Sequence, residues 1–290
     1  MVAAAADGNA PLRAIHVKAA IDQAAGHLER RPLLVVSDFD GTLSKIVSDP
    51  WGAEILPLGR RALRALSRMP DVHVAVLTGR TARDAAARIR VGGIRYVGNH
   101  GMERGLLGRG RRAEGLVTEG DTASHEATHA AERLADEMPS LIREPWLIVE
   151  RKPPSVAFHW RQAPDVESAG RRVAEAVDKL DPYHVLERFQ GRRVLEVRPF
   201  GAVAKGEAFE ALVDQTGARS AFLLGDDISD ALAFKVLRRL RSEGKTDGVA
   251  VAVQARAEVP ADVLESADIV LASPVAATQF LSGIARRLAS

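Results

Sequence analysis

Short apolar runs alternate with amphipathic stretches through the first hundred residues. Leu33–Val36, Val72–Leu77 and Ile94–Val97 are continuous and partly β-branched, as expected for strands buried on both faces of a parallel sheet. The stretches between them, which begin near Pro57 and Thr81, are expected to be helices. Strand, helix, strand, helix, strand is the order typical of a doubly wound α/β fold.

The pattern changes between residues 106 and 197. A helix followed by two strands occurs there twice, which favours a small antiparallel sheet covered by two helices. The helices are expected at Asp121–Met138 and Asp165–Leu180, and the strands at Trp146–Lys152, Ser155–Arg161, Tyr183–Phe189 and Arg193–Arg198.

Short buried strands return after this segment, at Ala221–Leu224, Val249–Val253 and Asp268–Leu271. We therefore predict an α/β protein with a doubly wound, Rossmann-like parallel-sheet core. The core domain is expected to be discontinuous, comprising residues 1–105 and 198–290, with residues 106–197 forming an inserted α+β cap domain.

Two aspartates directly follow the first predicted strand. Asp38 and Asp40 stand at the carboxyl end of that strand, the edge where open α/β sheets bind ligands, and Gly41 lets the chain turn there. At a separation of about 4 Å and an effective dielectric constant of about 20, two carboxylates repel each other by roughly 4 kcal/mol. A hard cation such as Mg²⁺ would remove that repulsion. The alternative is an ordinary turn.

Other predicted core strands also end in polar clusters, namely Thr78 with Arg80 and Asp226 with Asp227 and Asp230. A parallel sheet brings such strand ends to one edge, where acids, a cation and a hydroxyl group suit phosphoryl transfer. Lys205, placed where the chain returns to the core, is a candidate to hold the phosphate. The alternative for Lys205 is an ordinary surface lysine.

The predicted hairpins of the cap alternate between polar and apolar residues. Alternation places one set of polar side chains on a single face of the sheet, opposite the apolar residues: Glu150, Lys152, His159, Arg161 and Glu196. A face rich in charged hydrogen-bonding groups suits a sugar. A merely solvated outer face is the alternative.

The composition of the chain argues against several classes of protein. The 290 residues include 40 basic and 38 acidic ones, a net charge of +2 that argues against a dedicated nucleic-acid binder. There is no cysteine, which excludes disulfides and thiolate metal sites. We find no signal-peptide pattern and no apolar run of membrane length, so we expect a cytoplasmic protein. The strand-end cluster and the polar cap face favour a small-molecule sugar phosphate as its partner. The oligomeric state stays open, with a monomer as the simplest expectation.

Four ordered segments resemble the motifs of haloacid dehalogenase phosphatases with a large α/β cap: DFDGTL from Asp38, LTGR from Leu77, KG from Lys205 and GDDISD from Gly225. Four more segments narrow the resemblance to the trehalose-6-phosphate phosphatase family, over roughly Leu33 to the C-terminus: GNHGME from Gly98, VERK from Val149, HWR from His159 and EVRP from Glu196. One departure is Ala231-Leu232, where that family usually has two acidic residues.

The resemblance implies a role for each matching residue. Asp38 would be the nucleophile that forms an aspartyl-phosphate, and Asp40 the general acid and base. Mg²⁺ would be held by Asp38, Asp40 and Asp226, with Asp230 behind them. Phosphate would be bound by Thr78 and Lys205, and the rest of the substrate by the cap face together with Thr42, Arg80, Asn99 and His100.

The implied function is a Mg²⁺-dependent phosphatase that hydrolyses trehalose 6-phosphate. Two alternatives stay open: another capped phosphatase, acting on sucrose phosphate or a glycosyl-phosphoglycerate, and a catalytically inactive domain that senses sugar phosphates. An inactive domain would not need Asp38, Asp40, Lys205 and Asp226 together, and this chain has all four.

Overall fold

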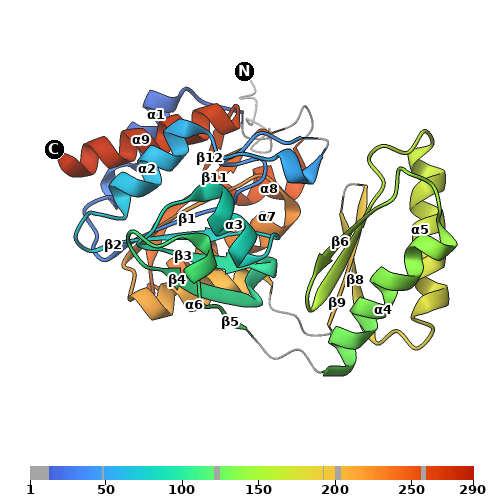
Figure 1. Cartoon of the computed structure of the whole chain (residues 1–290). Helices are drawn as coiled ribbons and strands as arrows, with labels where there is room; N and C mark the ends of the chain where they lie inside the picture. The colour runs from blue at the N-terminus through green and yellow to red at the C-terminus, as the bar shows by residue number, and fades with distance from the viewer. Residues whose placement is uncertain (1–12, 48, 121–124, 192, 200–203, 256–258) are drawn as a thin grey trace, which may run out of the picture. The chain divides into compact units, whose positions relative to one another are not determined.

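The computed structural model describes residues 13–47, 49–120, 125–191, 193–199, 204–255 and 259–290 (Figure 1). The described residues form two compact units. The core unit comprises those up to residue 47, residues 51–118 and those from 204 onward, and the inserted unit comprises those within 119–203 together with 49 and 50.

The core unit extends further than the sequence suggested. Residues 106–118, which we expected in the cap, belong to the core unit. Leu107 pairs with Ile94 in the core sheet, and Leu116 is buried in the core cluster. Conversely, residues 198 and 199 end a strand of the inserted unit.

An eight-stranded sheet contains the strands predicted for the core. Its order is β12-β11-β10-β1-β2-β3-β4-β5. The strands are β1 Leu33–Ser37, β2 Val72–Leu77, β3 Ile94–Gly98, β4 Glu103–Leu107, β5 Glu119–Gly120, β10 Ser220–Gly225, β11 Asp247–Val253 and β12 Ile269–Leu271. The pairs from β12 through to β3 are parallel, and β4 runs antiparallel to β3. The predicted α/β fold with a mainly parallel sheet is confirmed.

Helices cover both faces of this sheet (Figure 1). They are α1 Val17–Ala24, α2 Pro57–Leu66, α3 Ala82–Ile89, α6 Lys205–Thr216, α7 Ile228–Ser242, α8 Ala261–Ser266 and α9 Pro274–Ala289. Side chains of α1, α2, α3 and α9 share one buried cluster with the strands, including Leu63, Val35 and Phe280. Burying each such side chain contributes about 1.5–3 kcal/mol to the free energy of folding. The strand ends that carry the polar residues are therefore held by a stable, closely packed core.

The inserted unit is an antiparallel sheet with two helices. The strand order is β6-β7-β9-β8. Its elements are α4 His125–Leu141, β6 Ile148–Lys152, β7 Ser155–His159, α5 Val166–Leu180, β8 Leu186–Gly191 and β9 Val194–Pro199. Apolar side chains of both helices, such as Leu134 and Val173, pack on Phe158 and Val197 of the sheet. The first residues of the predicted helix, 121–124, lie outside the described residues.

Within the described part of the chain, we find no helix with both the length and the apolar character needed to cross a membrane.

Candidate active site

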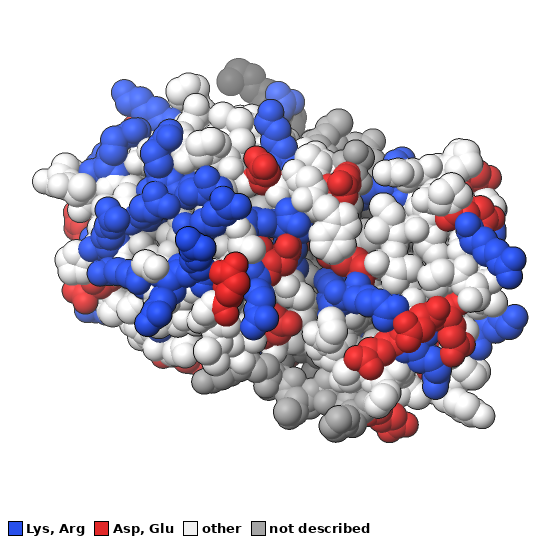
Figure 2. Space-filling model, viewed as in Figure 1, with Lys and Arg blue, Asp and Glu red and all other residues white. Residues whose placement is uncertain are grey.

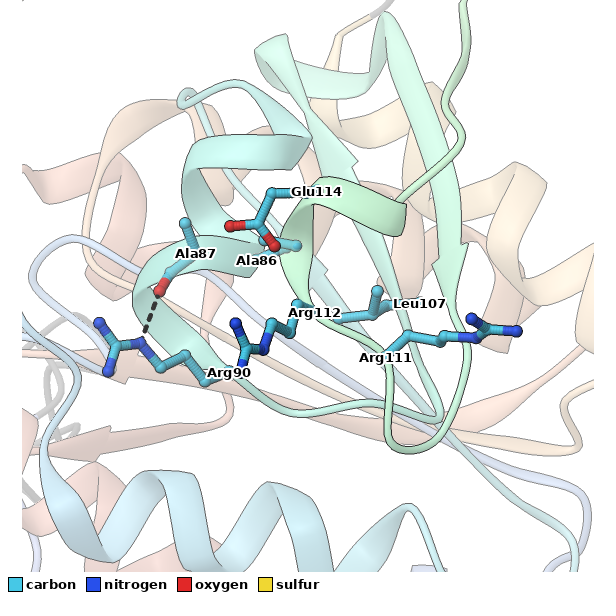
Figure 3. Close-up of a pocket in the computed structure, with 8 residues that line it drawn as sticks. Ala86, Ala87, Arg90, Leu107, Arg111, Arg112 and Glu114 are labelled. Atoms are coloured by element: carbon cyan, nitrogen blue, oxygen red, sulfur yellow. Dashed lines mark hydrogen bonds between the residues drawn. The ribbon is translucent and has the colours of Figure 1, made fainter.

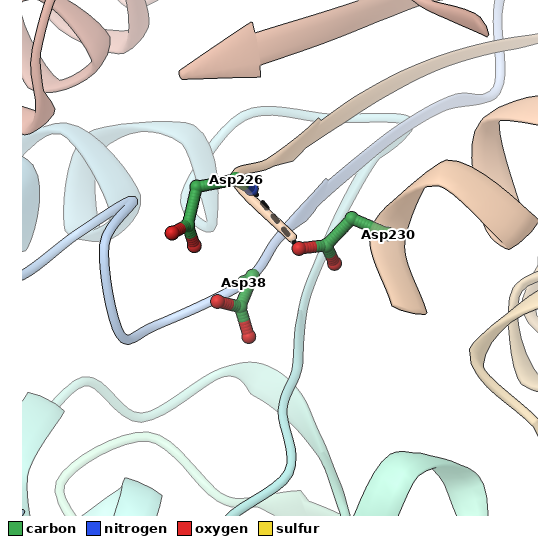
Figure 4. Close-up of side chains that lie close together, drawn as sticks. All are labelled: Asp38, Asp226 and Asp230. Atoms are coloured by element: carbon green, nitrogen blue, oxygen red, sulfur yellow. Dashed lines mark hydrogen bonds between the residues drawn. The ribbon is translucent and has the colours of Figure 1, made fainter. Parts of the chain in front are cut away.

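Two aspartates lie side by side because their strands are neighbours. β1 and β10 pair in parallel, and the amide of Asp38 donates a hydrogen bond of 2.9 Å to the carbonyl of Leu224, so the two chains leave the sheet together. Asp38 and Asp226 follow these strands. Together with Asp230 they offer carboxylate oxygens that all lie within 4.8 Å of one another (Figure 4).

Gly41 allows the acidic loop to approach Asp226. Its φ is +82°, in the left-handed region that favours glycine. A Cβ atom at this position would lie 2.3 Å from Oδ2 of Asp226, far inside van der Waals contact. The glycine of the DFDGT segment therefore serves the site directly, because a side chain here would displace the carboxylate of Asp226.

Lys205 lies buried between two of the carboxylates. It begins α6 and is 2% exposed, and its Nζ donates to Oδ1 of Asp38 at 3.0 Å and to Oδ1 of Asp230 at 2.8 Å. Burial opposes its positive charge, but the carboxylates of Asp230 and Asp38 outweigh that effect and raise the pKa of Lys205 well above its usual value. The lysine is thus held as a cation at the strand ends, and the alternative of an ordinary surface lysine is excluded.

Asp230 organises the loop that carries Asp226. Its Oδ2 accepts hydrogen bonds from the backbone N–H groups of Asp226 at 3.0 Å and Asp227 at 3.2 Å. In return, Oδ1 of Asp227 accepts from the N–H of Asp230 at 3.1 Å, so the two residues cap the start of α7 reciprocally. With Lys205 on its other oxygen, Asp230 has little capacity left to bind a metal directly.

Asp38 is buried close to other carboxylates, and both conditions disfavour its negatively charged form. Its side chain is 5% exposed. The pKa of Asp38 is raised from 3.8 to about 6, because burial, together with the charges of Asp227 and Asp40, outweighs the opposing effect of Lys205. A hard divalent cation between Asp38 and Asp226 would relieve this excess of negative charge, and all-oxygen donors are those that such cations prefer. The residues present therefore fit a metal ion.

Arg80 fixes the second aspartate of the acidic loop. Both carboxylate oxygens of Asp40, which we expected among the metal ligands, accept hydrogen bonds from Arg80, at 2.6 Å from Nε and 2.9 Å from Nη2. Nη1 of Arg80 donates to Asp84 at 2.9 Å, and the guanidinium lies over the ring of Phe39. Arg80 was expected to bind substrate, and in the structure it orients Asp40.

Thr78 and the residues after β3 form one further side of the site. The side chain of Thr78 is buried, and its Oγ1 accepts a hydrogen bond from the N–H of Arg80 at 3.2 Å. Asn99 and His100 both have positive φ, and their N–H groups donate to the carbonyls of Arg80 at 2.8 Å and Thr78 at 3.0 Å. A Cβ atom at Gly79 would lie 2.7 Å from the ring of His100, so that ring packs directly against the backbone.

Two residues predicted to contact substrate are completely buried. Asn99 is 0% exposed, and its Nδ2 donates to Glu103 at 2.7 Å, which places its amide inside the loop. Thr42 is also 0% exposed. Both positions are therefore suited to supporting the loops rather than to touching a ligand in this conformation.

In the inserted unit, the strand register brings four of the five predicted polar residues to one face. Glu150 and Glu196 share a row across β7, and Lys152 and His159 lie two residues away along their strands. Lys152 pairs with Glu196 at 2.6 Å, and Nε2 of His159 lies 2.9 Å from Glu150. Arg161 follows the end of β7 and is outside the sheet.

The same face carries residues that sequence reasoning missed. Arg198 lies two residues beyond Glu196 on β9, and its guanidinium lies 4.4 Å from the ring centroid of Phe189 on β8. Glu187, also on β8, lies 3.5 Å from Nε of Arg198. The sequence did indicate Arg198, because the two-residue alternation of a strand places it on the same face as Glu196.

The chain is similar in sequence to known phosphatases. The family model of the trehalose-phosphatases matches residues 36–264. The trehalose-phosphate phosphatase of Mycobacterium avium is 34% identical over 278 residues, covering 93% of this chain and 66% of the relative. The protein of the same description from Mycobacterium leprae is 33% identical, covering 90% and 59%. The chain thus spans less than two thirds of the length of these relatives.

Solved structures share the fold. The C-terminal domain of the trehalose-6-phosphate phosphatase of C. albicans superposes with a TM-score of 0.74 at 21% identity, covering 96% of this chain and 99% of that domain. A trehalose-6-phosphate phosphatase related protein gives a TM-score of 0.67 at 19% identity, covering 87% and 97%. The match of the family model to most of the chain, over the segments that carry the strand-end residues, shows that the chain belongs to the trehalose-phosphatase family.

Proposed function

We propose that this chain hydrolyses trehalose 6-phosphate to trehalose and inorganic phosphate. The family and the names of the relatives support the substrate. The observation that carries the proposal is the buried group of Asp38, Asp226 and Lys205 at neighbouring strand ends, because it combines a carboxylate nucleophile, a cation and a candidate metal site in one place. Phosphoryl transfer depends on such positioning and charge neutralisation.

The chemistry follows from two aspartates. A carboxylate oxygen of Asp38 attacks phosphorus, the bond from phosphorus to the sugar oxygen breaks, and that oxygen takes a proton from Asp40. Asp40 then accepts a proton from a water molecule, which attacks the aspartyl-phosphate and releases phosphate with Asp38 restored. Arg80 orients Asp40 for both transfers through its two hydrogen bonds of 2.6 and 2.9 Å.

Lys205 and a bound metal ion would both stabilise negative charge on the phosphoryl group. Lys205 holds Asp38 in place in the free protein and, as a buried cation, offers its remaining donor capacity to the phosphoryl oxygens. We propose Mg²⁺ as the cation held by Asp38 and Asp226, where it would neutralise charge on the transferring group. Thr78, at the end of β2, is the proposed hydroxyl contact to phosphate.

The polar face of the inserted sheet is proposed to bind the sugar. Glu150, Lys152, His159 and Glu196 present paired charges that can exchange their mutual hydrogen bonds for those of sugar hydroxyls. Arg198 and Phe189 add a guanidinium stacked on an aromatic ring to the same face. Such a face suits a disaccharide better than a small aryl phosphate, which has no hydroxyl groups.

The test is phosphate release from a panel of substrates: trehalose 6-phosphate, sucrose 6-phosphate and a glycosyl-phosphoglycerate. We expect the highest kcat/KM for trehalose 6-phosphate, loss of activity in EDTA and its return with Mg²⁺. A preference for another member of the panel would overturn the substrate. Full activity in EDTA would overturn the metal, and no turnover of any sugar phosphate would favour an inactive sensing domain.

A further inference from the structure

Positive charge is strongly segregated along the chain. Residues 60–112 contain thirteen arginines, no lysine and three acidic residues, a net charge of +10, whereas the whole chain carries only +2. This segment includes most of α2, all of α3 and the loop after β4. Figure 2 shows basic side chains gathered over the part of the core unit that carries these helices. Some of these arginines, such as Arg80 and Arg88, form ion pairs with aspartates. The positive charge available to bind an anionic ligand therefore comes from the other arginines.

Several of the remaining arginines are held in place by hydrogen bonds to neutral groups. Arg60 donates to the carbonyls of Ile89 at 3.0 Å and Arg88 at 3.1 Å, and Arg90 donates to the carbonyl of Ala87 at 3.0 Å. Carbonyl oxygens at the end of α3 orient these guanidinium groups and cancel only a part of their charge. Within the described residues, Arg60, Arg90 and Arg112 have no carboxylate within ion-pair distance.

A cavity of about 480 Å³ is lined by Arg90, Arg111 and Arg112 of this segment (Figure 3). Ala86 and Leu107, both 1% exposed, belong to its apolar lining, and Ala87 completes the wall on α3. Arg90 and Arg112 both line it, and the side chain of Arg112 extends toward Arg90, whereas Arg111 points away from them (Figure 3). The carboxylate of Glu114 is the acidic group of the lining.

We propose that this cavity binds a phosphorylated small molecule of about the size of a nucleotide. Arg90 and Arg112 each supply a planar guanidinium, whose fork of N–H donors recognises phosphate oxygens. The apolar lining suits a flat or apolar portion of the ligand, and the volume lies in the range of about 300–1,000 Å³ typical of small-molecule sites. This is a binding site of the core unit, separate in its residues from the aspartates and Lys205 at the strand ends. The proposal therefore stands independently of the phosphatase activity.

The test measures binding of a fluorescent, non-hydrolysable ATP analogue to the full chain in EDTA at an ionic strength of about 0.15 M, where diffuse surface charge is largely screened. We expect saturable binding. Arg112→Ala, and Arg90→Asn, which tolerates the left-handed backbone of residue 90, should each weaken it about tenfold or more. Arg61→Ala, which removes an exposed arginine of α2 outside the cavity, is the matched control and should change binding less than about twofold.

Two further variants separate a cavity from a charged surface. Ala87→Phe fills the cavity and leaves every charge in place, so it should abolish binding. Glu114→Gln removes the acidic group of the lining and should tighten binding. If the probe binds at the phosphatase site instead, its affinity should be unchanged in both variants, and that result would overturn the proposal. Equal weakening by Arg61→Ala and Arg112→Ala, with tighter binding of a DNA oligonucleotide than of the probe, would indicate a polyanion-binding surface and would also overturn the proposal. The absence of any saturable binding would overturn it as well.

Discussion

Replacing Lys205 by methionine removes a buried cation from between two buried carboxylates. Lys205 and Asp230 are each 2% exposed, and Asp38 is 5% exposed. Breaking a buried ion pair by removing one partner typically costs about 3–5 kcal/mol, because the remaining charge stays buried without compensation. Two carboxylates lose their partner here, so we expect Lys205→Met to lower the free energy of unfolding by roughly 3–5 kcal/mol in EDTA.

The assay is urea unfolding followed by circular dichroism. Lys235→Met, which removes an exposed lysine that lies 3.4 Å from Asp262, is the matched control and should cost less than about 1 kcal/mol. Adding Asp230→Asn to Lys205→Met should recover part of the loss, because one unpaired charge becomes neutral. Saturating Mg²⁺ should also reduce the loss. A cost no larger than that of Lys235→Met would refute this account of the buried charges.

Other predictions address the metal site and the sugar face. Gly41→Ala should lower Mg²⁺ affinity and kcat/KM by about a hundredfold or more while the protein stays folded, because its Cβ would lie 2.3 Å from Asp226. Gly110→Ala, at a φ of +73° with no neighbour within 4 Å, is the control, and equal losses in both variants would contradict the proposed clash. Below the pKa of about 6 for Asp38, Mg²⁺ must displace a proton, so titration calorimetry should show affinity falling up to about tenfold per pH unit as the pH drops; a constant affinity from pH 7 to pH 5 would oppose this. Lys152→Ala should lower kcat/KM for trehalose 6-phosphate about ten- to a hundredfold through the loss of a charge-assisted hydrogen bond, and should leave p-nitrophenyl phosphate nearly unaffected. Equal losses on both substrates would mean that Lys152 does not contact the sugar.

The sequence predicted the elements whose burial is uniform. Strands such as Val72–Leu77 are buried along most of their length, so their apolar runs are unbroken and easy to identify. β4 was missed because only Leu107 of its five residues is buried while Arg104 and Leu106 are exposed, so its short run, next to the two-residue edge strand β5, mixes charged and apolar residues. The expected domain boundary at residue 105 was too early for the same reason.

The candidate site was predicted as a set of strand ends but without its pairings. Parallel neighbours fix that Asp38 and Asp226 lie together, which depends only on topology. That Arg80 pairs with Asp40, and that Lys205 lies between Asp38 and Asp230, depends on side-chain directions after the strands end. Those directions are set by tertiary packing, which the local sequence pattern does not record.

The role of Asp38 as nucleophile is tested by comparing phosphate release from trehalose 6-phosphate by the native chain and by Asp38→Asn, both in saturating Mg²⁺. The amide is nearly the size of the carboxylate but cannot form an aspartyl-phosphate, so the variant should remain folded and lose turnover. Asp262→Asn, at an exposed aspartate of α8, is the control and should keep full activity. Retained phosphate release by a folded Asp38→Asn protein would contradict the assignment of Asp38 as the nucleophile.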